Sequence, residues 1–498
     1  MADHSEKAGS KLRVSDIARP RSVIHPALDW VGGQLIVGVE FQNGDRAVLT
    51  SKDGLVEIDK IGPICERDGK FESPVTPEVA EQFIAYLGSN PTTYPKEDLN
   101  AMLSELADYF SRFVVFPEKY WSRVMATWTL ATYLFPVFQA FPYLWLTSPE
   151  PGCGKSLLGQ ILANLSFNGE FMASPTEANM FHLPEQNRGV QVWDEVEFVN
   201  QVEKSRFQSV KAILLNGYRN GGVVPRQVGT SWDKQVKYHV FCPRVLIGLS
   251  QLPETARQRS IELRLRKRNS GQEVELYRVD DQAKEEEQLR AKCVLTALKC
   301  ADAINGFYRN KNLRTDLEGL LGKAGREVDD IWLPLFAVVV ACSPDAKIDS
   351  AQSSLIGDLA KAAVQLASFR ANQTSGDTSR FPKPVAASGS KGGGSDEPHE
   401  ALVVALEFVQ VEGIEPSDLA KMVSKRLKRE VSAQWLSKSL GRLGIRAVKY
   451  DGRRVFIVRQ SEIQEARVKL GIAPPSFAQM TETGQQGREG QQEFDNRT

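Results

Sequence analysis

The residues with the clearest chemical signature lie in the run SPEPGCGKS, which ends in Gly152, Cys153, Gly154, Lys155 and Ser156. In a glycine-rich loop that opens a helix, backbone N–H groups surround phosphate oxygens, a lysine reaches the outer phosphates and a serine hydroxyl ligates Mg²⁺. The run therefore predicts a site for the cofactors ATP and Mg²⁺, with Ser156 as a metal ligand. The expected nucleotide contacts are Gly152, Cys153, Gly154, Lys155, Ser156 and Leu157.

An acidic pair, Asp194 and Glu195, follows the apolar run of residues 189–193. Behind a phosphate-binding loop, such a pair can hold the metal with its first carboxylate and polarise the attacking water with its second. We therefore expect Asp194 to be a metal ligand and Glu195 to be the catalytic base. The alternative, a surface acidic pair at the end of a strand, is less favoured because the loop lies upstream.

Further catalytic candidates lie at the end of the next apolar strand, which is expected at residues 244–250, and shortly after it. Ser250, with Gln251 as the reserve, stands where a sensor of the γ-phosphate is expected. Arg257 and Arg259 are the candidates for an arginine finger that enters a neighbouring subunit's site and stabilises charge on the γ-phosphate. The alternative is that each arginine is structural.

The elements around these residues predict an α/β fold with a P-loop NTPase core at residues 141–270. Residues 143–147 are apolar, aromatic and β-branched, which indicates a buried strand, and the leucines after Lys155 have helical spacing. Further strands are expected at residues 189–193 and 261–265, and an amphipathic helix at 202–218.

The remaining chain divides by composition into several further parts. Turn signals between alternating apolar residues indicate β-hairpins near the amino terminus, and Ser, Gly and Pro dominate one long linker. The expected parts are disorder at 1–25, a small β-rich module at 26–75, a helical collar at 97–140, a helical lid at 271–370, a flexible linker at 371–399, a winged helix-turn-helix at 400–471 and a disordered tail at 472–498.

Two regions have the charge expected of DNA-binding surfaces. The pattern of residues 219–238 is typical of a β-hairpin, which carries the basic residues Arg226 and Lys234 and the aromatic Trp232. The alternative is a solvated hairpin that only packs. Residues 401–471 carry 14 Lys and Arg against 8 Asp and Glu, a net charge of +6, which suits phosphate contact. Docking of a protein is the alternative there. The expected DNA contacts of the second region are Lys425, Arg429, Lys438, Arg442, Arg453 and Arg454.

The bulk composition excludes several classes of protein. The formal net charge of the 498 residues is zero, and six cysteines are scattered without a C-x-x-C pair. This spacing argues against a zinc site or a disulfide framework and favours a cytoplasmic location. The apolar stretch 128–146 is interrupted by Pro136 and Pro142, so we expect a helix and a strand instead of a membrane span. The amino terminus has no apolar signal core.

Taken together, the motifs resemble a family of P-loop ATPases of phages, plasmids and other mobile elements, a family of unknown function that is associated with primase and helicase modules. The likeness rests on SPEPGCGKS, VWDEVE, ILLNGYRNGG, PRVLIGLSQLPETARQRSIELRLRKR and, in the last domain, WLSKSLGRLGIR and YDGRRVFIV. It implies an AAA-type core, similar to superfamily 3 helicases. It also implies that Arg259 is the finger, with Arg257 less favoured. Pro149 replaces the usual first glycine, and Gln258 replaces the acidic residue that usually precedes the finger.

The resemblance implies a Mg²⁺-dependent ATPase that forms a homo-oligomeric ring on DNA, and a primase as a further partner. The leading hypothesis is a DNA helicase or helicase-like replication protein, with single-stranded DNA in the pore and duplex DNA at the winged helix. One rival is an ATP-gated DNA-binding initiator, loader or defence switch that does not unwind DNA. Another is a DNA-binding regulator with an inactive nucleotide site.

Overall fold

The computed structural model describes residues 24–57, 70, 73–173, 175–196, 204–228, 234–249, 252–268, 271–323, 325–349, 354–374, 397–409, 414–427, 430–450, 453–456, 462–463 and 466. The predictions for Ser250, Gln251 and Arg429 lie outside these residues, as do Trp232, most of the predicted linker, residues 1–23 of the predicted disordered start and the whole predicted tail. Ile24 and His25, which the prediction counted as disordered, are described and buried. For Lys234, Arg442, Arg453 and Arg454 the backbone is described and the side chain is not.

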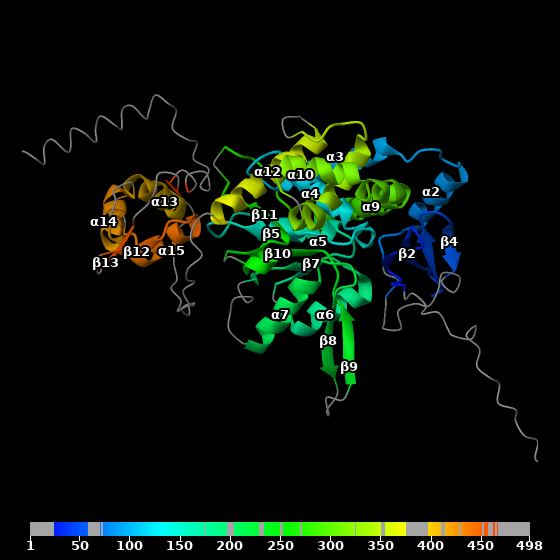
Figure 1. Ribbon diagram of the computed structural model, residues 1–498, viewed down its shortest axis with the longest axis horizontal. Helices are drawn as coiled ribbons and strands as arrows, with labels where there is room; N and C mark the ends of the chain where they lie inside the picture. Colours follow the sequence, from blue (N-terminus) through cyan, green and yellow to red (C-terminus); the bar gives the residue numbers. More distant parts are fainter. Residues whose placement is uncertain are drawn as a thin grey trace, which may run out of the picture.

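A five-stranded parallel sheet forms the centre of the molecule (Figure 1). In spatial order its strands are β11 (Ser260–Arg264), β5 (Tyr143–Thr147), β10 (Arg244–Gly248), β7 (Gln191–Trp193) and β6 (Glu170–Met172). Strand β10 is inserted between β5 and β7, so that Val245 lies opposite both Leu144 and Val192. All five carboxyl ends therefore meet at one edge of the sheet.

The strands are buried on both faces, which explains their nearly continuous apolar sequence. Alternate residues enter two different hydrophobic clusters. Leu144 and Leu146 belong to the larger cluster on one face, whereas Tyr143 and Trp145 belong to a second cluster on the other. A parallel sheet of this kind needs a layer of helices on each side.

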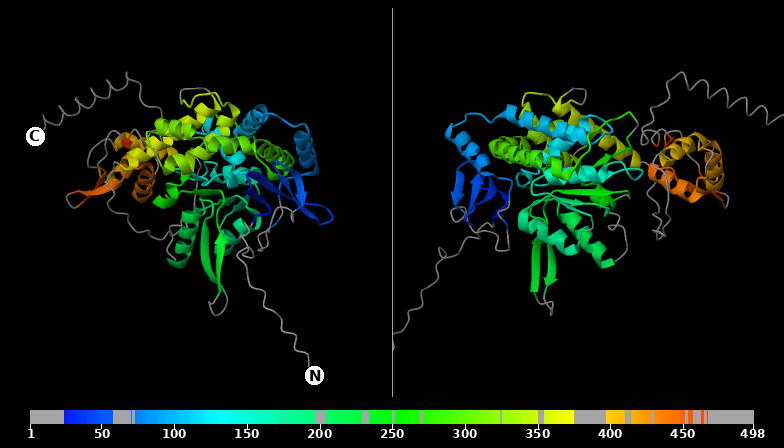
Figure 2. Two further views of the ribbon diagram at one scale, coloured as in Figure 1. Left: turned by 45° about the vertical axis from the view of Figure 1, so that its right-hand side comes forward. Right: turned by 180° about the vertical axis from the view of Figure 1, so that it is seen from behind.

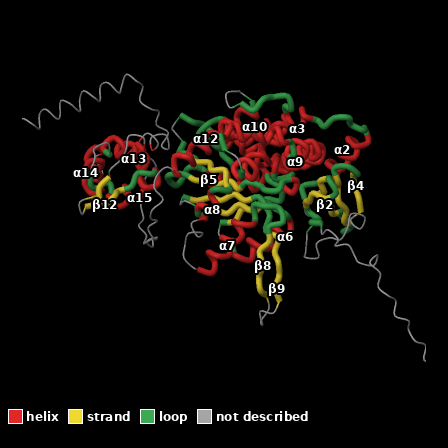
Figure 3. The backbone as a smooth tube through the Cα atoms, in the orientation of Figure 1, coloured by secondary structure: helices red, strands yellow, loops and turns green. Residues whose placement is uncertain are grey.

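Helices from three distant parts of the chain cover the first face of the sheet (Figures 1 and 3). The expected collar and lid are therefore not separate units, because their buried residues form one hydrophobic cluster together with the sheet. The members are α3 (Lys96–Phe113), α4 (Tyr120–Ala131), the 3₁₀ turn Phe135–Val137, α5 (Lys155–Leu165), α9 (Val279–Tyr308), α10 (Lys311–Leu321), the π-helix Glu327–Trp332, α11 (Leu333–Cys342) and α12 (Leu355–Thr374).

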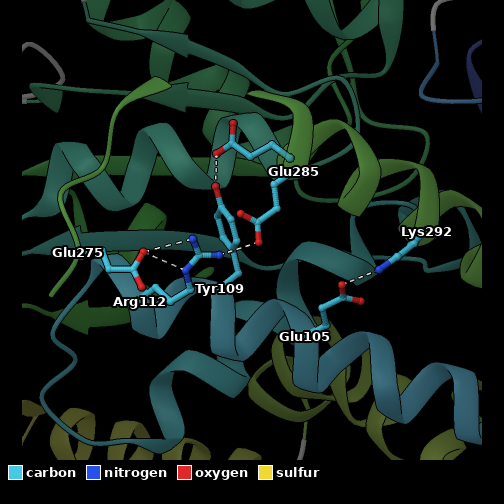
Figure 4. Close-up of polar contacts among 7 residues, drawn as sticks. Glu105, Tyr109, Arg112, Glu275, Glu285 and Lys292 are labelled. Atoms are coloured by element: carbon cyan, nitrogen blue, oxygen red, sulfur yellow. Dashed lines mark hydrogen bonds and ion pairs between the residues drawn. The ribbon is translucent and has the colours of Figure 1, made fainter. Parts of the chain in front are cut away.

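A buried acid joins three of these helices. The Glu286 carboxylate of α9 accepts hydrogen bonds from Tyr109 of α3 at 3.0 Å, from Tyr277 at 2.7 Å and from Asn164 of α5 at 2.9 Å. Figure 4 shows the neighbouring Arg112 between the carboxylates of Glu275 and Glu285. Helix α5 is thus tied at its carboxyl end to the layer around it. No described helix is long and apolar enough to cross a membrane.

The second face of the sheet carries α6 (Glu177–Asn187), α7 (Lys204–Asn216) and the short α8 (Glu254–Arg257). From this side the predicted hairpin, β8 (Val223–Val228) and β9 (Lys234–His239), projects away from the body (Figures 1 and 2). Its base is held by Arg244 of β10, which is 0% exposed. The guanidinium donates to Gln191 Oε1, to Tyr143 Oη and to the carbonyls of Gly217, Val240 and Cys242.

The amino-terminal module contains an antiparallel sheet, as its turn signals predicted, and one helix that was not predicted. It consists of β1 (Leu28–Val31), β2 (Gln34–Glu40), β3 (Arg46–Thr50), β4 (Gly54–Glu57) and α2 (Pro77–Gly88). Leu35, Val37 and Leu49 join the larger cluster of the body. His25 docks the module on α6, because its Nε2 lies 2.6 Å from the Glu185 carbonyl oxygen and its Nδ1 accepts from Ala27 N at 3.2 Å. The module therefore packs as part of the body.

The carboxyl-terminal unit has a small core of its own. It contains α13 (Glu397–Phe408), α14 (Pro416–Leu427), α15 (Ala433–Leu443) and an antiparallel hairpin of β12 (Ala447–Tyr450) and β13 (Arg453–Phe456). An isolated bridge pairs Ile414 with Phe456. The order of elements is the one expected from the sequence, and its assignment as a winged helix-turn-helix stays a prediction.

Candidate nucleotide site

The phosphate-type loop leaves the sheet where β5 ends at Thr147 and enters α5 at Lys155. Gly152 and Gly154 both adopt the left-handed backbone conformation, with φ of 78° and 80°. Residues with a Cβ adopt this conformation only at a cost in free energy. A third glycine, Gly159, brings α5 close to the sheet: a Cβ there would lie 2.3 Å from Ile247 Cδ1. The three glycines therefore determine the conformation of the loop and the close packing of α5 against the sheet.

The surroundings of the two loop glycines fit a bound phosphate. Apart from the neighbouring residues, no heavy atom of the described part of the chain lies within 4 Å of the position of a Cβ on Gly152 or Gly154, so a ligand can approach the backbone closely. Ser156 is exposed in the first turn of α5, where the positive end of the helix favours anions. The residues present therefore fit a nucleotide phosphate group with its metal ion.

Lys155 lies inside the loop and is 9% exposed. Its Nζ donates to Ser148 Oγ at 2.5 Å and lies 3.5 Å from the Glu150 carbonyl oxygen. Ser148 Oγ also donates to that carbonyl at 2.5 Å. A phosphate oxygen that replaced these neutral oxygens would give the ammonium group an oppositely charged acceptor, which adds Coulomb attraction to the hydrogen bond.

The acid pair ends β7 at the same edge of the sheet. Since β10 alone separates β7 from β5, the two strands lie about 10 Å apart. Asp194 Oδ1 accepts from Glu195 N at 2.8 Å, and Glu195 is exposed with φ of 54°. A left-handed residue other than glycine at such a place stores backbone strain, a feature that clusters at functional sites.

The structure adds two residues to the loop that the sequence analysis did not single out, Ser148 and Lys267. Burial raises the pKa of the Cys153 thiol, while a hydrogen bond with Ser148 and the charges of Lys155 and Lys267 act in the opposite direction. Ser148 could have been found as the first residue after the strand. Lys267 could not, because its position depends on the pairing of β11 with β5.

Arg259 lies at the opposite edge of the sheet from the loop. Its carbonyl accepts from Tyr143 N at the start of β5, and five residues of strand span about 16 Å. Its guanidinium packs 4.7 Å from the centre of the Tyr218 ring and donates to the Thr255 carbonyl, while its Nε has no partner among the described residues. Arg259 therefore does not reach the loop of its own subunit, and a role in a neighbouring subunit stays a prediction.

The predicted DNA contacts differ in their surroundings. Arg226 of the hairpin forms an ion pair with Glu177 of α6 and lies over the Phe181 ring at 4.4 Å. Lys425 and Lys438 are exposed on α14 and α15. Contact with DNA stays a prediction for all of them.

Comparisons with known proteins assign no family. Neither a protein-family model nor a curated protein matches the chain. Among solved structures, the A-form apo structure of the C-terminal region of NrS-1 is similar, with 13% sequence identity and a TM-score of 0.25 over 85% of this chain and 96% of that one. A TM-score of this size does not establish a shared fold.

Proposed function

We propose that this chain is a Mg²⁺-dependent ATPase that remodels DNA, as a ring-forming helicase or a helicase-like replication protein of a mobile element. One observation carries the proposal: the open left-handed loop around Lys155 and the acid pair after β7 lie at the same edge of one parallel sheet. Ligands of open α/β sheets bind at this edge, outside the carboxyl ends of the strands.

Each residue has a distinct task in the proposed reaction. The loop amides from Gly152 to Ser156 and the Lys155 ammonium bind and orient the phosphates. Ser156 and Asp194 would hold Mg²⁺, which when bound neutralises charge on the outer phosphates. Glu195 accepts a hydrogen bond or proton from the attacking water. Arg259 from a neighbouring subunit would stabilise the charge on the γ-phosphate.

The test compares Lys155→Ala with Lys292→Ala, a change of an exposed lysine that pairs with Glu105 on the outer surface. We expect Lys155→Ala to abolish ATP binding or turnover and Lys292→Ala to keep both. ATPase rates are measured with and without single-stranded DNA, together with strand displacement and native mass. Near-normal turnover of Lys155→Ala refutes the proposal.

A second candidate is an ATP-gated DNA-binding initiator, loader or switch that does not unwind DNA. The ion pair between Arg226 and Glu177 favours it, because a hairpin cation already engaged with α6 has to exchange partners before it grips a strand. Turnover without strand displacement supports this candidate. A protein that binds DNA but shows no turnover is instead the regulator with an inactive site.

A further inference from the structure

We propose that Lys267 is a second cation of the nucleotide site, which contacts the phosphates that ATP and ADP share. The inference rests on the proposed function, since it assumes that a nucleotide occupies the loop around Lys155. It adds a residue that determines nucleotide affinity and leaves the chemical step to the acid pair.

The first argument is the path of the chain beyond β11. Arg264 pairs with Thr147 at the end of β5, and Leu265 N still donates to the Thr147 carbonyl at 2.8 Å. The two segments therefore remain about 5 Å apart where the phosphate-type loop begins. Lys267 follows two residues later, beside the loop, and its long flexible side chain carries a mobile point charge.

The second argument is the charge that Lys267 brings close to the loop. Leu265 is buried in the cluster on the α5 side of the sheet, so the chain beyond β11 starts beside that helix. The charge of Lys267 reaches Cys153 in the loop, where it opposes the rise in the thiol pKa that burial causes. Lys267 is half-buried, whereas Arg268 is exposed.

The third argument decides which phosphates are involved. In the strand order β11-β5-β10-β7, β11 lies on one side of β5 and the acid pair of β7 lies on the other. The metal and the attacked γ-phosphate belong on the side of the acids. A cation on the side of β11 therefore faces the remaining phosphates, which are present in both substrate and product.

A competing role for Lys267 is to neutralise Glu150, whose side chain is buried in the same loop and 6% exposed. The two roles have different consequences. A partner of Glu150 stabilises the empty loop, so that removal of both charges restores the affinity for nucleotide. If Lys267 contacts the phosphates directly, removal of both charges does not restore the affinity for nucleotide.

The experiment measures the Kd of MgATP and MgADP by calorimetric titration for Lys267→Met, Lys267→Arg and the control Arg268→Met. We expect Lys267→Met to weaken both nucleotides about tenfold, as the loss of one charge-assisted contact implies, with kcat at saturating ATP changed less than about twofold. Lys267→Arg should recover most of the affinity, and Arg268→Met should behave like the wild type.

Three results would overturn the inference: unchanged affinity in Lys267→Met while Lys155→Ala abolishes binding, a loss confined to MgATP, or full recovery in the double variant Lys267→Met with Glu150→Gln. Unchanged binding in Lys155→Ala as well would instead refute the proposed function. Melting temperatures of the empty proteins show whether each variant is folded.

Discussion

Glu195 offers the sharpest test of whether the acid pair is a functional site, because replacing it by glycine should raise the stability of the protein and lower its catalytic activity. Its φ of 54° places a residue with a Cβ in the left-handed region, which costs about 1–2 kcal/mol. A glycine adopts this conformation freely but has more conformational entropy to lose on folding, about 0.5–1 kcal/mol. Glu195→Gly should therefore stabilise the folded protein by about 0.5–1 kcal/mol.

The expected gain corresponds to a rise in Tm of about 2 °C for a domain of this size, measured by calorimetry on the empty protein. Turnover should fall by at least about a hundredfold, the contribution of a general base. Glu195→Gln is the matched control: it keeps the strain and loses the base, so its Tm should equal that of the wild type while hydrolysis stalls and ATP still binds. A lower Tm in Glu195→Gly, or wild-type turnover in either variant, refutes this reasoning.

Four further predictions concern the body of the protein and its hairpin. Protonation of His25 should destabilise the packing of the amino-terminal sheet. Burial and the charge of Arg188 lower the pKa of His25 well below 6.5, so the unfolded chain binds the proton more tightly than the folded one. The stability measured by urea unfolding should therefore fall as the pH drops below about 6.5 in the wild type but not in His25→Gln. Gly217→Ala should destabilise the folded protein by about 1–3 kcal/mol, because its Cβ would lie 2.3 Å from Arg244 Nη1 and 2.6 Å from the Val240 carbonyl oxygen. A Cβ on Gly319 of α10 would meet no atom of the described residues outside its own helix within 4 Å, so Gly319→Ala should be neutral or stabilising. A double-mutant cycle of Arg219→Ala and Asp330→Asn should give a coupling of about 0.5–1 kcal/mol that weakens with salt, since this pair at 2.9 Å joins the turn before the hairpin to the π-helix; zero coupling contradicts it. Glu177→Gln should raise the affinity for single-stranded DNA in a salt-dependent manner if Arg226 is a DNA contact, and no change in affinity argues against that role.

Much of the local structure could be predicted from the sequence, because strong short-range signals determine it. The strand at Tyr143–Thr147, the helix that begins at Lys155 and the antiparallel hairpins lie where expected. Strand β6 and helix α6 were missed. The strand has three residues, Glu170–Met172, and α6 contains Pro184, so neither shows a clear period.

The arrangement of the site depended on long-range pairing that no local pattern contains. The insertion of β10 between β5 and β7 decides how far the acid pair lies from the loop. The pairing of β11 with β5 decides that Arg259 lies at one edge of the sheet and Lys267 at the other. The expected collar and lid merged into one layer because apolar faces with different positions in the chain share the same sheet.

The buried guanidinium of Arg244 has a mechanical consequence. It is attached to the first residue of β10, and its hydrogen bonds end on carbonyls at Gly217, Val240 and Cys242, on either side of the hairpin. These hydrogen bonds therefore connect the base of the hairpin rigidly to β10. A small displacement of β10 along its own axis would be transmitted to this base, and the distal end of the hairpin would move by a larger distance.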